Sequence, residues 1–278
     1  MKIYFYLKNK MVLLSEINSH VRDKMISFNE EAHIYTINGD SSYMSVTTFV
    51  HSNFPKFDAN KIIEKMMKSE NWQRNKYFGQ TKEEIMAKWE VNRDEAANSG
   101  TEMHKLIEDY YNKIIDEKDF PANMIVMEYF KDFLQDYKDE NEYKPYRSEW
   151  RVFDEELKIA GSIDMVFENN KGELLIYDWK RCRNINKGND QFKYGKPLNP
   201  DLNDMFDTNY WHYVLQLNIY KIILERNYNK KVTELALINL HPNNWNKSYC
   251  CFFLPILNEN QINGIIKWRF DQLTTNKV

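Results

Sequence analysis

The stretch "KIAGSIDMVFENNKGELLIYDWK", residues 158–180, contains two apolar segments joined by Asn, Asn, Lys and Gly. Residues 158–168 and 173–180 are predicted to be strands, and the residues between them form a turn sequence. Partners in an antiparallel hairpin lie equally far from the turn. Asp164 and Asp178 should therefore lie opposite each other, within one residue of register, with Cβ atoms about 5 Å apart.

Two opposed carboxylates repel each other, and a divalent cation would offset that repulsion. Mg²⁺ accepts carboxylate ligands and keeps positions open for water. Lys180 follows Asp178 by two residues, so strand alternation places both side chains on one face, whereas Trp179 points to the other face and into packing. Lys180 could assist an attacking water or stabilise charge on a phosphate. The alternative for Asp178 and Lys180 is an ion pair on a solvated face.

The residues before this hairpin are predicted to be mostly helical. Residues 33–46 alternate around Asn38-Gly39-Asp40 and predict a β-hairpin. The helices and one loop expected after it span residues 59–70, 71–80 (the loop), 81–97, 100–115 and 123–139.

The residues around and after the hairpin predict an α/β core. Residues 146–153 precede it as a strand, and a long polar loop spans 184–208. The elements expected after that loop are a helix (208–227), strands (232–241 and 248–256) and a helix (259–273). The fold class predicted is α/β: a mixed sheet core flanked by helices, with a helical N-terminal part.

The length of 278 residues suits a single large domain. Residues 1–24 are interpreted as an N-terminal extension, because a more ordinary start follows at Met25. Residues 25–278 form the predicted domain, with 25–140 mostly helical and 141–278 as the catalytic core.

The formal net charge of −3 gives no global signal for nucleic acid, although local basic patches remain possible. Three cysteines form no disulfide framework, which indicates a reducing, intracellular compartment. No apolar run approaches the roughly 18 residues that span a bilayer, so no membrane contact is expected.

Four segments together resemble one nuclease superfamily. "GSID" and "DWK" at residues 161–164 and 178–180 resemble the G-x-x-D and D-x-K motifs of the PD-(D/E)XK nucleases. "GTEMHKLIEDYY" (100–111) and "QLNIY" (216–220) are similar to the G-T-x-x-H-x-x-x-E and Q-x-x-x-Y motifs of the RecB-type exonuclease branch. The segment 43–58 also resembles viral and mitochondrial genome maintenance exonuclease relatives. The resemblance implies a restriction-endonuclease-like fold and a Mg²⁺ or Mn²⁺ cofactor.

The resemblance also implies roles for individual residues. His104 would be a third metal ligand beside Asp164 and Asp178, and the Trp179 carbonyl a further one. Supporting roles fall to Glu149 near the metal, to Glu108 as an orienting group, and to Gln216 and Tyr220, one helical turn apart. Each could instead be an ordinary structural or solvated side chain.

Basic and aromatic residues in two segments are candidates for DNA contact through phosphates and base stacking. These residues are Arg74, Lys76 and Tyr77 in the first segment, and Arg181, Arg183 and Lys187 in the second. Nothing indicates readout of base edges, and any of the aromatics could instead pack the helical part.

The function expected from these residues and the resemblance is a metal-dependent DNA nuclease, with exonuclease action on single-stranded ends preferred. The alternatives are a structure-specific endonuclease and a non-catalytic nucleic-acid-binding or assembly module on the same fold. An iron–sulphur nuclease is disfavoured, because three cysteines cannot supply four thiolates. The sequence is compatible with a viral, phage-encoded or organellar protein.

Overall fold

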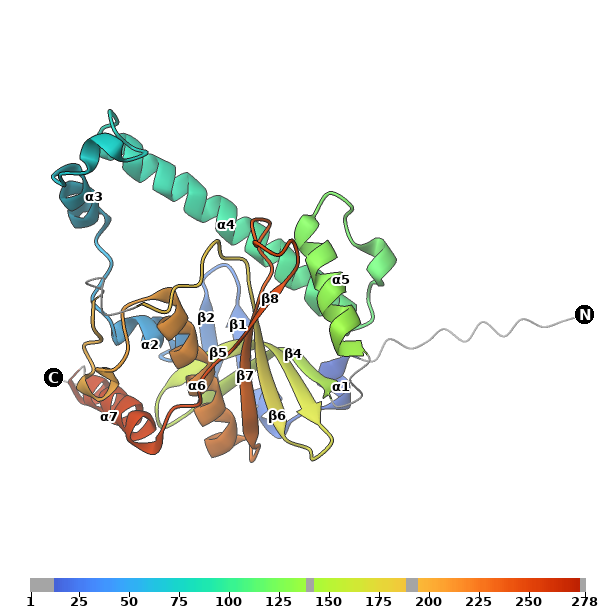
Figure 1. Cartoon of the computed structure of the whole chain (residues 1–278). Helices are drawn as coiled ribbons and strands as arrows, with labels where there is room; N and C mark the ends of the chain where they lie inside the picture. Colours follow the sequence, from blue (N-terminus) through green and yellow to red (C-terminus); the bar gives the residue numbers. More distant parts are fainter. Residues whose placement is uncertain (1–12, 139–142, 189–194, 276–278) are drawn as a thin grey trace, which may run out of the picture.

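The structure is a computed structural model that describes residues 13–138, 143–188 and 195–275. A mixed sheet of six strands forms its centre, with helices on both faces (Figure 1). The strand order is β3-β5-β6-β7-β8, and β4 pairs with β5 on its other edge. The strands are β3 (Met44–Ser45), β4 (Tyr143–Asp154), β5 (Ile159–Asn169), β6 (Leu174–Lys180), β7 (Val232–Asn239) and β8 (Cys250–Phe253). The α/β class predicted from the sequence is confirmed.

Each face of the sheet has its own apolar core, because side chains alternate along the strands. Leu174 and Ile176 of β6 pack toward α6 (Asn209–Asn227), α2 (Val46–Ser52) and α7 (Glu259–Thr275). Tyr177 and Trp179 of the same strand pack toward α5 (Ile125–Lys138) and the C-terminal part of α4 (Lys82–Tyr111). Asp178 and Lys180 therefore belong to the face that α6 covers.

Helix α4 corrects the prediction of two helices at 81–97 and 100–115, because it runs unbroken from Lys82 to Tyr111. Gly100 costs about 1 kcal/mol inside a helix but does not remove a hydrogen bond, so it does not end one. The Thr81 side chain caps the start, as its sequence predicts. A shorter helix, α3 (Ala59–Met67), packs near this end of α4.

The N-terminal strands also differ from the prediction. The hairpin pairs β1 (Ile26–Asn29) with β2 (Ile34–Ile37), and Met44 and Ser45 instead pair parallel with β5. The turn at Asn38-Gly39 closes a single bridge between Ile37 and Asp40, and Tyr35 and Ile37 belong to a separate apolar cluster with Phe153. The short helix α2 was not predicted. Asp139, the predicted end of α5, and the boundary at 140–141 lie outside the described residues.

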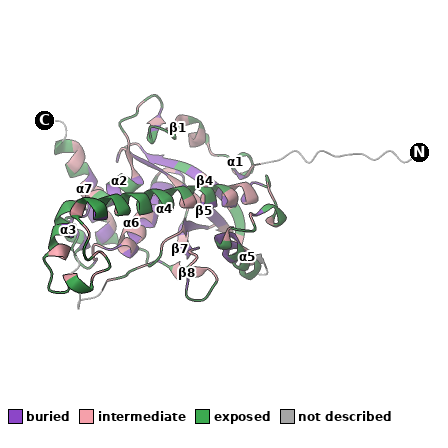
Figure 2. Ribbon diagram, turned by 90° about the horizontal axis from the view of Figure 1, so that it is seen from above, coloured by how far each residue is buried: buried purple, intermediate pink, exposed green. Residues whose placement is uncertain are grey.

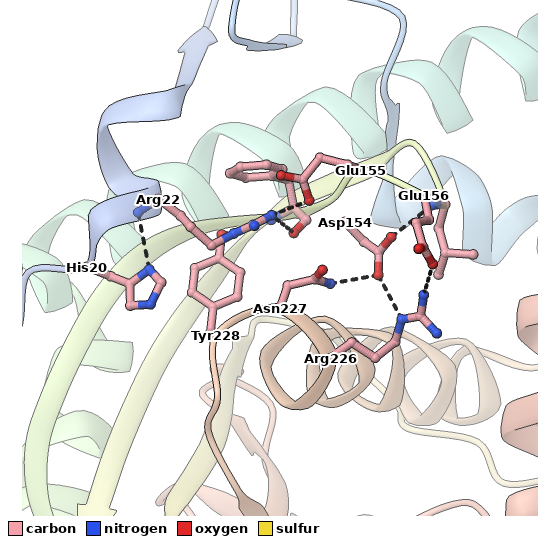
Figure 3. Close-up of polar contacts among 10 residues, drawn as sticks. His20, Arg22, Asp154, Glu155, Glu156, Arg226, Asn227 and Tyr228 are labelled. Carbon is pink, nitrogen blue, oxygen red and sulfur yellow. Dashed lines mark hydrogen bonds and ion pairs between the residues drawn. The ribbon is translucent and has the colours of Figure 1, made fainter.

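Residues 13–25 make specific contacts with the sheet, although residues 1–24 were expected to be an extension. Asp23 accepts hydrogen bonds from Arg147 Nη1 (2.7 Å) and from Trp150 Nε1 (3.1 Å), both on β4. Arg22 donates to Glu155 (2.5 Å) and lies over the rings of Phe153 and Tyr228 (Figure 3).

The far end of β4 is tied to the end of α6 in the same region. Asp154 is fully buried and accepts hydrogen bonds from Arg226 Nε (3.0 Å) and Asn227 Nδ2 (2.7 Å), while Arg226 also pairs with Glu156 (Figure 3). These contacts fix the end of β4 against the C-terminal end of α6.

The middle of α4 is exposed along most of its length (Figure 2). Its buried residues are Ile85 near the start and Met103, Ile107 and Tyr111 near the end. Figure 1 shows the helix leaving the sheet and reaching α3 at its far end. None of the helices in the described part of the chain has the length and apolar character needed to cross a membrane.

Candidate metal centre and nuclease site

The candidate site lies where β5 changes its strand partner. On one edge, β5 pairs with β3 through Ile159 and Ala160, and with β6 from Met165 onward. Met165 pairs with Tyr177, so Asp164 and Asp178 occupy the next opposed positions, as the turn geometry predicts. Here the Asp164 carboxylate accepts the backbone N–H of Trp179 at 2.9 Å. The two carboxylates thus lie together at the point where the strands separate.

His104 reaches this point from α4. Its Nε2 lies 3.0 Å from the Trp179 carbonyl oxygen, which can only accept, so Nε2 carries the proton. Its Nδ1 then faces Asp164 Oδ2 and Glu149 Oε1, each at 3.6 Å. A histidine whose second N–H donates to a carbonyl is oriented as metal-binding histidines commonly are. The Trp179 carbonyl, expected as a metal ligand, is engaged by His104.

Glu149 adopts a backbone conformation that non-glycine residues rarely use, with φ of 44° inside β4. Such strain costs on the order of 1–3 kcal/mol and persists where the surroundings enforce it, often at functional sites. Its Oε2 accepts a hydrogen bond from Ser162 Oγ at 2.9 Å, and its Oε1 faces His104. The β4 backbone is therefore turned so that this carboxylate enters the site.

Asp178, which is buried, and Lys180, which is half-buried, form an ion pair beside the other three residues. Lys180 Nζ lies 2.5 Å from Asp178 Oδ2, and Asp178 is only 2% exposed. Gln216 of α6 approaches Asp178 Oδ1 at 3.5 Å. Lys180 also lies 5.1 Å from the centre of the Tyr213 ring. The alternative of an ion pair on a solvated face is therefore wrong, because both side chains lie between β6 and α6.

Tyr220 lies one helical turn beyond Gln216 and packs against β5 at Gly161. A Cβ atom added at Gly161 would come within 2.8 Å of the Tyr220 ring and hydroxyl. Glycine at this position therefore lets α6 approach β5 three residues before Asp164. The side chain of Tyr220 is buried in the core that covers this face of the sheet.

The charges in the site shift each other's protonation. Burial lowers the pKa of His104, but the Asp164 and Glu149 carboxylates outweigh this and raise it to about 9. Burial, and then repulsion from Asp164, raises the pKa of Asp178 to about 7, although Lys180 opposes this. Burial also raises the pKa of Asp164. Burial opposes the Lys180 ammonium, yet Asp178 and Asp164 raise the pKa of Lys180 above its usual value.

His104, Glu149 and Asp164 could hold a metal ion. One ligand atom from each lies within 4.8 Å of the others. Ligands 2.1 Å from an octahedral ion are about 3.0 Å apart when adjacent and about 4.2 Å apart when opposite. The two nitrogen–oxygen distances of 3.6 Å fall between these values. Carboxylate oxygens suit Mg²⁺ and Mn²⁺, and the imidazole favours Mn²⁺. This set includes Glu149 and not Asp178, whose part as a ligand stays a prediction.

Other predicted site residues lie apart from this centre. Glu108 lies on α4 one turn beyond His104 and pairs with Lys105 at 3.4 Å. Arg74, Lys76 and Tyr77 precede the start of α4, roughly 33 Å from His104 along the helix. Tyr77 accepts a hydrogen bond from Trp89 Nε1 at 2.9 Å, so part of this ring serves local packing.

The second basic segment begins directly at the site. Arg181 and Arg183 follow Lys180 at the end of β6, and Lys187 lies over the ring of Tyr210 at 4.9 Å. Arg181 also lines a cavity of about 260 Å³ between α4, the start of α5 and the residues after β7. Of the two basic segments, this one is adjacent to the candidate centre.

Sequence reasoning missed Ser162 and Tyr213. Ser162 precedes Asp164 by two residues and shares its face of β5, so strand alternation could have found it. Tyr213 precedes Tyr220 by two helical turns and therefore shares the face of α6 that carries Gln216.

A comparison with protein-family models gives no match for this chain, and neither does a comparison with curated proteins.

Proposed function

We propose that the chain is a divalent-metal-dependent deoxyribonuclease that hydrolyses phosphodiester bonds and prefers single-stranded DNA ends. The observation that supports this most is the cluster of His104, Glu149 and Asp164 directly beside the ion pair of Asp178 and Lys180. The resemblance of the surrounding motifs to the PD-(D/E)XK nucleases supports the same reaction class.

His104, Glu149 and Asp164 would hold Mg²⁺ or Mn²⁺, with Asp178 as a further candidate ligand. The bound ion would supply Lewis acidity toward a phosphoryl oxygen and lower the pKa of a coordinated water. Ser162 and the Trp179 carbonyl orient two of these side chains through their hydrogen bonds. The chain thus supplies ligands whose directions are fixed before metal binds.

Lys180 acts as a fixed positive charge. Because its neighbours raise the pKa of Lys180, the ammonium stays protonated at neutral pH and is a poor base. It suits stabilisation of the negative charge that develops on a phosphate. Burial and the neighbouring Asp164 carboxylate raise the pKa of Asp178 to about 7, so its carboxylate would accept a proton from water more readily than an ordinary aspartate. Lys180→Ala should therefore retain metal binding and slow cleavage by about 10²- to 10³-fold.

The decisive experiment compares linear and circular single-stranded DNA, each incubated with the full chain in Mg²⁺, Mn²⁺ or EDTA. Metal-dependent loss of the linear strand with survival of the circle supports an exonuclease. Asp164→Asn should abolish cleavage, whereas Glu173→Gln, a carboxylate at the other end of the β5–β6 hairpin, should not. Intact DNA under every condition, at enzyme concentrations that bind it, would favour the non-catalytic module. Cleavage of the circle would favour an endonuclease.

A further inference from the structure

The loop between β7 and β8, residues 240–249, rises from the same edge of the sheet as Lys180. Because β6 and β7 are parallel, their C-terminal ends lie side by side. Leu240 N donates to the Lys180 carbonyl at 2.7 Å. Asn239 accepts from Cys182 N at 3.0 Å and donates to Cys182 O at 2.9 Å. Hydrogen bonds therefore hold the β7–β8 loop against the segment after β6, beside the candidate site.

Side chains brace this loop from inside and from α5. Asn244 is buried and donates to Asn239 O at 2.8 Å and to Ser248 O at 2.9 Å. Ser248 and Tyr249 donate to the carboxylates of Asp132 and Asp136 on α5, at 2.6 Å and 2.5 Å. Figure 1 shows the loop beside α4 and α5. Its backbone is thus held in one shape without contributions from Trp245.

Trp245 lies in this braced loop and is 88% exposed. Tryptophan is usually well buried, because its ring carries a large apolar surface. The hydrogen bonds of Asn244 and Ser248 hold the loop on either side of Trp245, and the ring itself lies outside the fold. A rigid loop that presents an exposed aromatic ring is suited to stacking against a flat ligand at low entropic cost.

The charges near Trp245 favour an anionic ligand. Arg181 and Arg183 lie close enough to His241 that, together with its burial, they lower the pKa of His241. Lys247 and Arg183 are exposed and Arg181 is half-buried, and residues 240–249 contain no carboxylate. The carboxylates of Asp132 and Asp136 are engaged by the loop hydroxyls. Aromatic rings among cations are the combination that binds single-stranded nucleic acid.

We propose that Trp245 stacks on an unpaired nucleobase of a DNA strand whose backbone runs along Arg181 and Arg183 to the candidate metal centre. The proposal rests on the proposed function and names the contact that selects single-stranded substrate. A paired base hides its faces in the stack, so the ring can engage it only after unpairing.

Binding of a fluorescein-labelled thymidine oligonucleotide in EDTA tests this contact. Stacking on one base predicts that Trp245→Ala raises Kd by roughly 5- to 150-fold, with an unchanged salt slope because no charge is lost. Trp245→Phe should recover much of the affinity. DNA should quench the tryptophan fluorescence of the parent chain more than that of Trp245→Phe. The control is Phe253→Ala on the same hairpin, 61% exposed and three ladder positions from the site edge, which should bind as the parent does.

The possible results separate the two proposals. If the parent cleaves DNA but Trp245→Ala binds single strands as tightly as the parent, the stacking proposal is wrong and the proposed function stands. An equal loss of affinity for a duplex of the same length would also overturn it, because a duplex offers no free base face. If the parent binds tightly through Trp245 without cleaving, stacking is supported and the nuclease proposal fails. A parent that does not bind DNA refutes both.

Discussion

The protonation of His104 gives a prediction that needs no substrate. Asp164 and Glu149 raise its pKa from 6.5 to about 9 in the folded chain. A raised pKa means that folding favours the protonated form. That stabilisation is complete below pH 6.5 and is lost as the pH rises through 9. A shift of about 2.5 units corresponds to about 3.4 kcal/mol. Because the His104 side chain is 27% exposed, water screens part of it, and about 2–3 kcal/mol is expected.

The assay is urea unfolding of the metal-free chain in EDTA at pH 6, 7.5 and 9. The parent should lose about 2–3 kcal/mol more than His104→Gln across this range, because glutamine carries no charge although its amide can still donate to the Trp179 carbonyl. Asp178 affects the free energy of unfolding at lower pH. Because its pKa is raised, its stabilising contribution is lost as the pH rises from about 4 through 7, in the parent and in His104→Gln alike. His33→Asn, at an exposed left-handed position, is the matched control.

Two results would refute this reasoning. If His104→Gln keeps the full decline between pH 6.5 and 9, the charge on His104 does not stabilise the fold. If the parent shows no decline while Asp164→Asn behaves identically, the imidazole and the carboxylates are not in contact.

The remaining predictions concern metal, packing and the N-terminal contacts. Mn²⁺ at about 100 times its Kd should stabilise the metal-free chain by about 2.7 kcal/mol in a thermal melt, and an equal rise in Asp164→Asn would place the ion elsewhere. Gly161→Ala should destabilise by about 1–3 kcal/mol in urea, because Tyr220 must move; an unchanged midpoint would contradict that close contact. Asp23→Ala leaves Arg147 buried without its carboxylate and should cost about 2–3 kcal/mol; a loss below 0.5 kcal/mol would show that the N-terminal contacts are weak.

The β5–β6 hairpin was predictable because its information is local. The turn sequence and the alternation fix which residues oppose each other, so the positions of Asp164, Asp178 and Lys180 could be derived from spacing alone. Helices α5, α6 and α7 were predictable from local sequence signals for the same reason. Gly100 misled the prediction at α4, because a glycine signal at a helix end is also compatible with a helix interior.

The rest depends on contacts between distant segments. The parallel pairing of β3 with β5 joins residues more than a hundred positions apart, and no local pattern specifies it. Glu149 enters the site through a backbone angle that its sequence does not reveal. His104 was found only through a resemblance, since its partners come from β4, β5 and β6. Asp23 looked like part of an extension because its partner Arg147 lies far along the chain.

The end of α4 that carries His104 should resist local unfolding better than the exposed middle of the helix. Burial of Met103, Ile107 and Tyr111 holds the end that carries His104, whereas residues 86–102 rely on backbone hydrogen bonds open to water. A single exposed helix of this kind is only marginally stable on its own. Amide hydrogens in this stretch should exchange with solvent well before those around His104. Limited proteolysis should likewise cut α4 near Gly100 first and leave the sheet with its candidate centre intact.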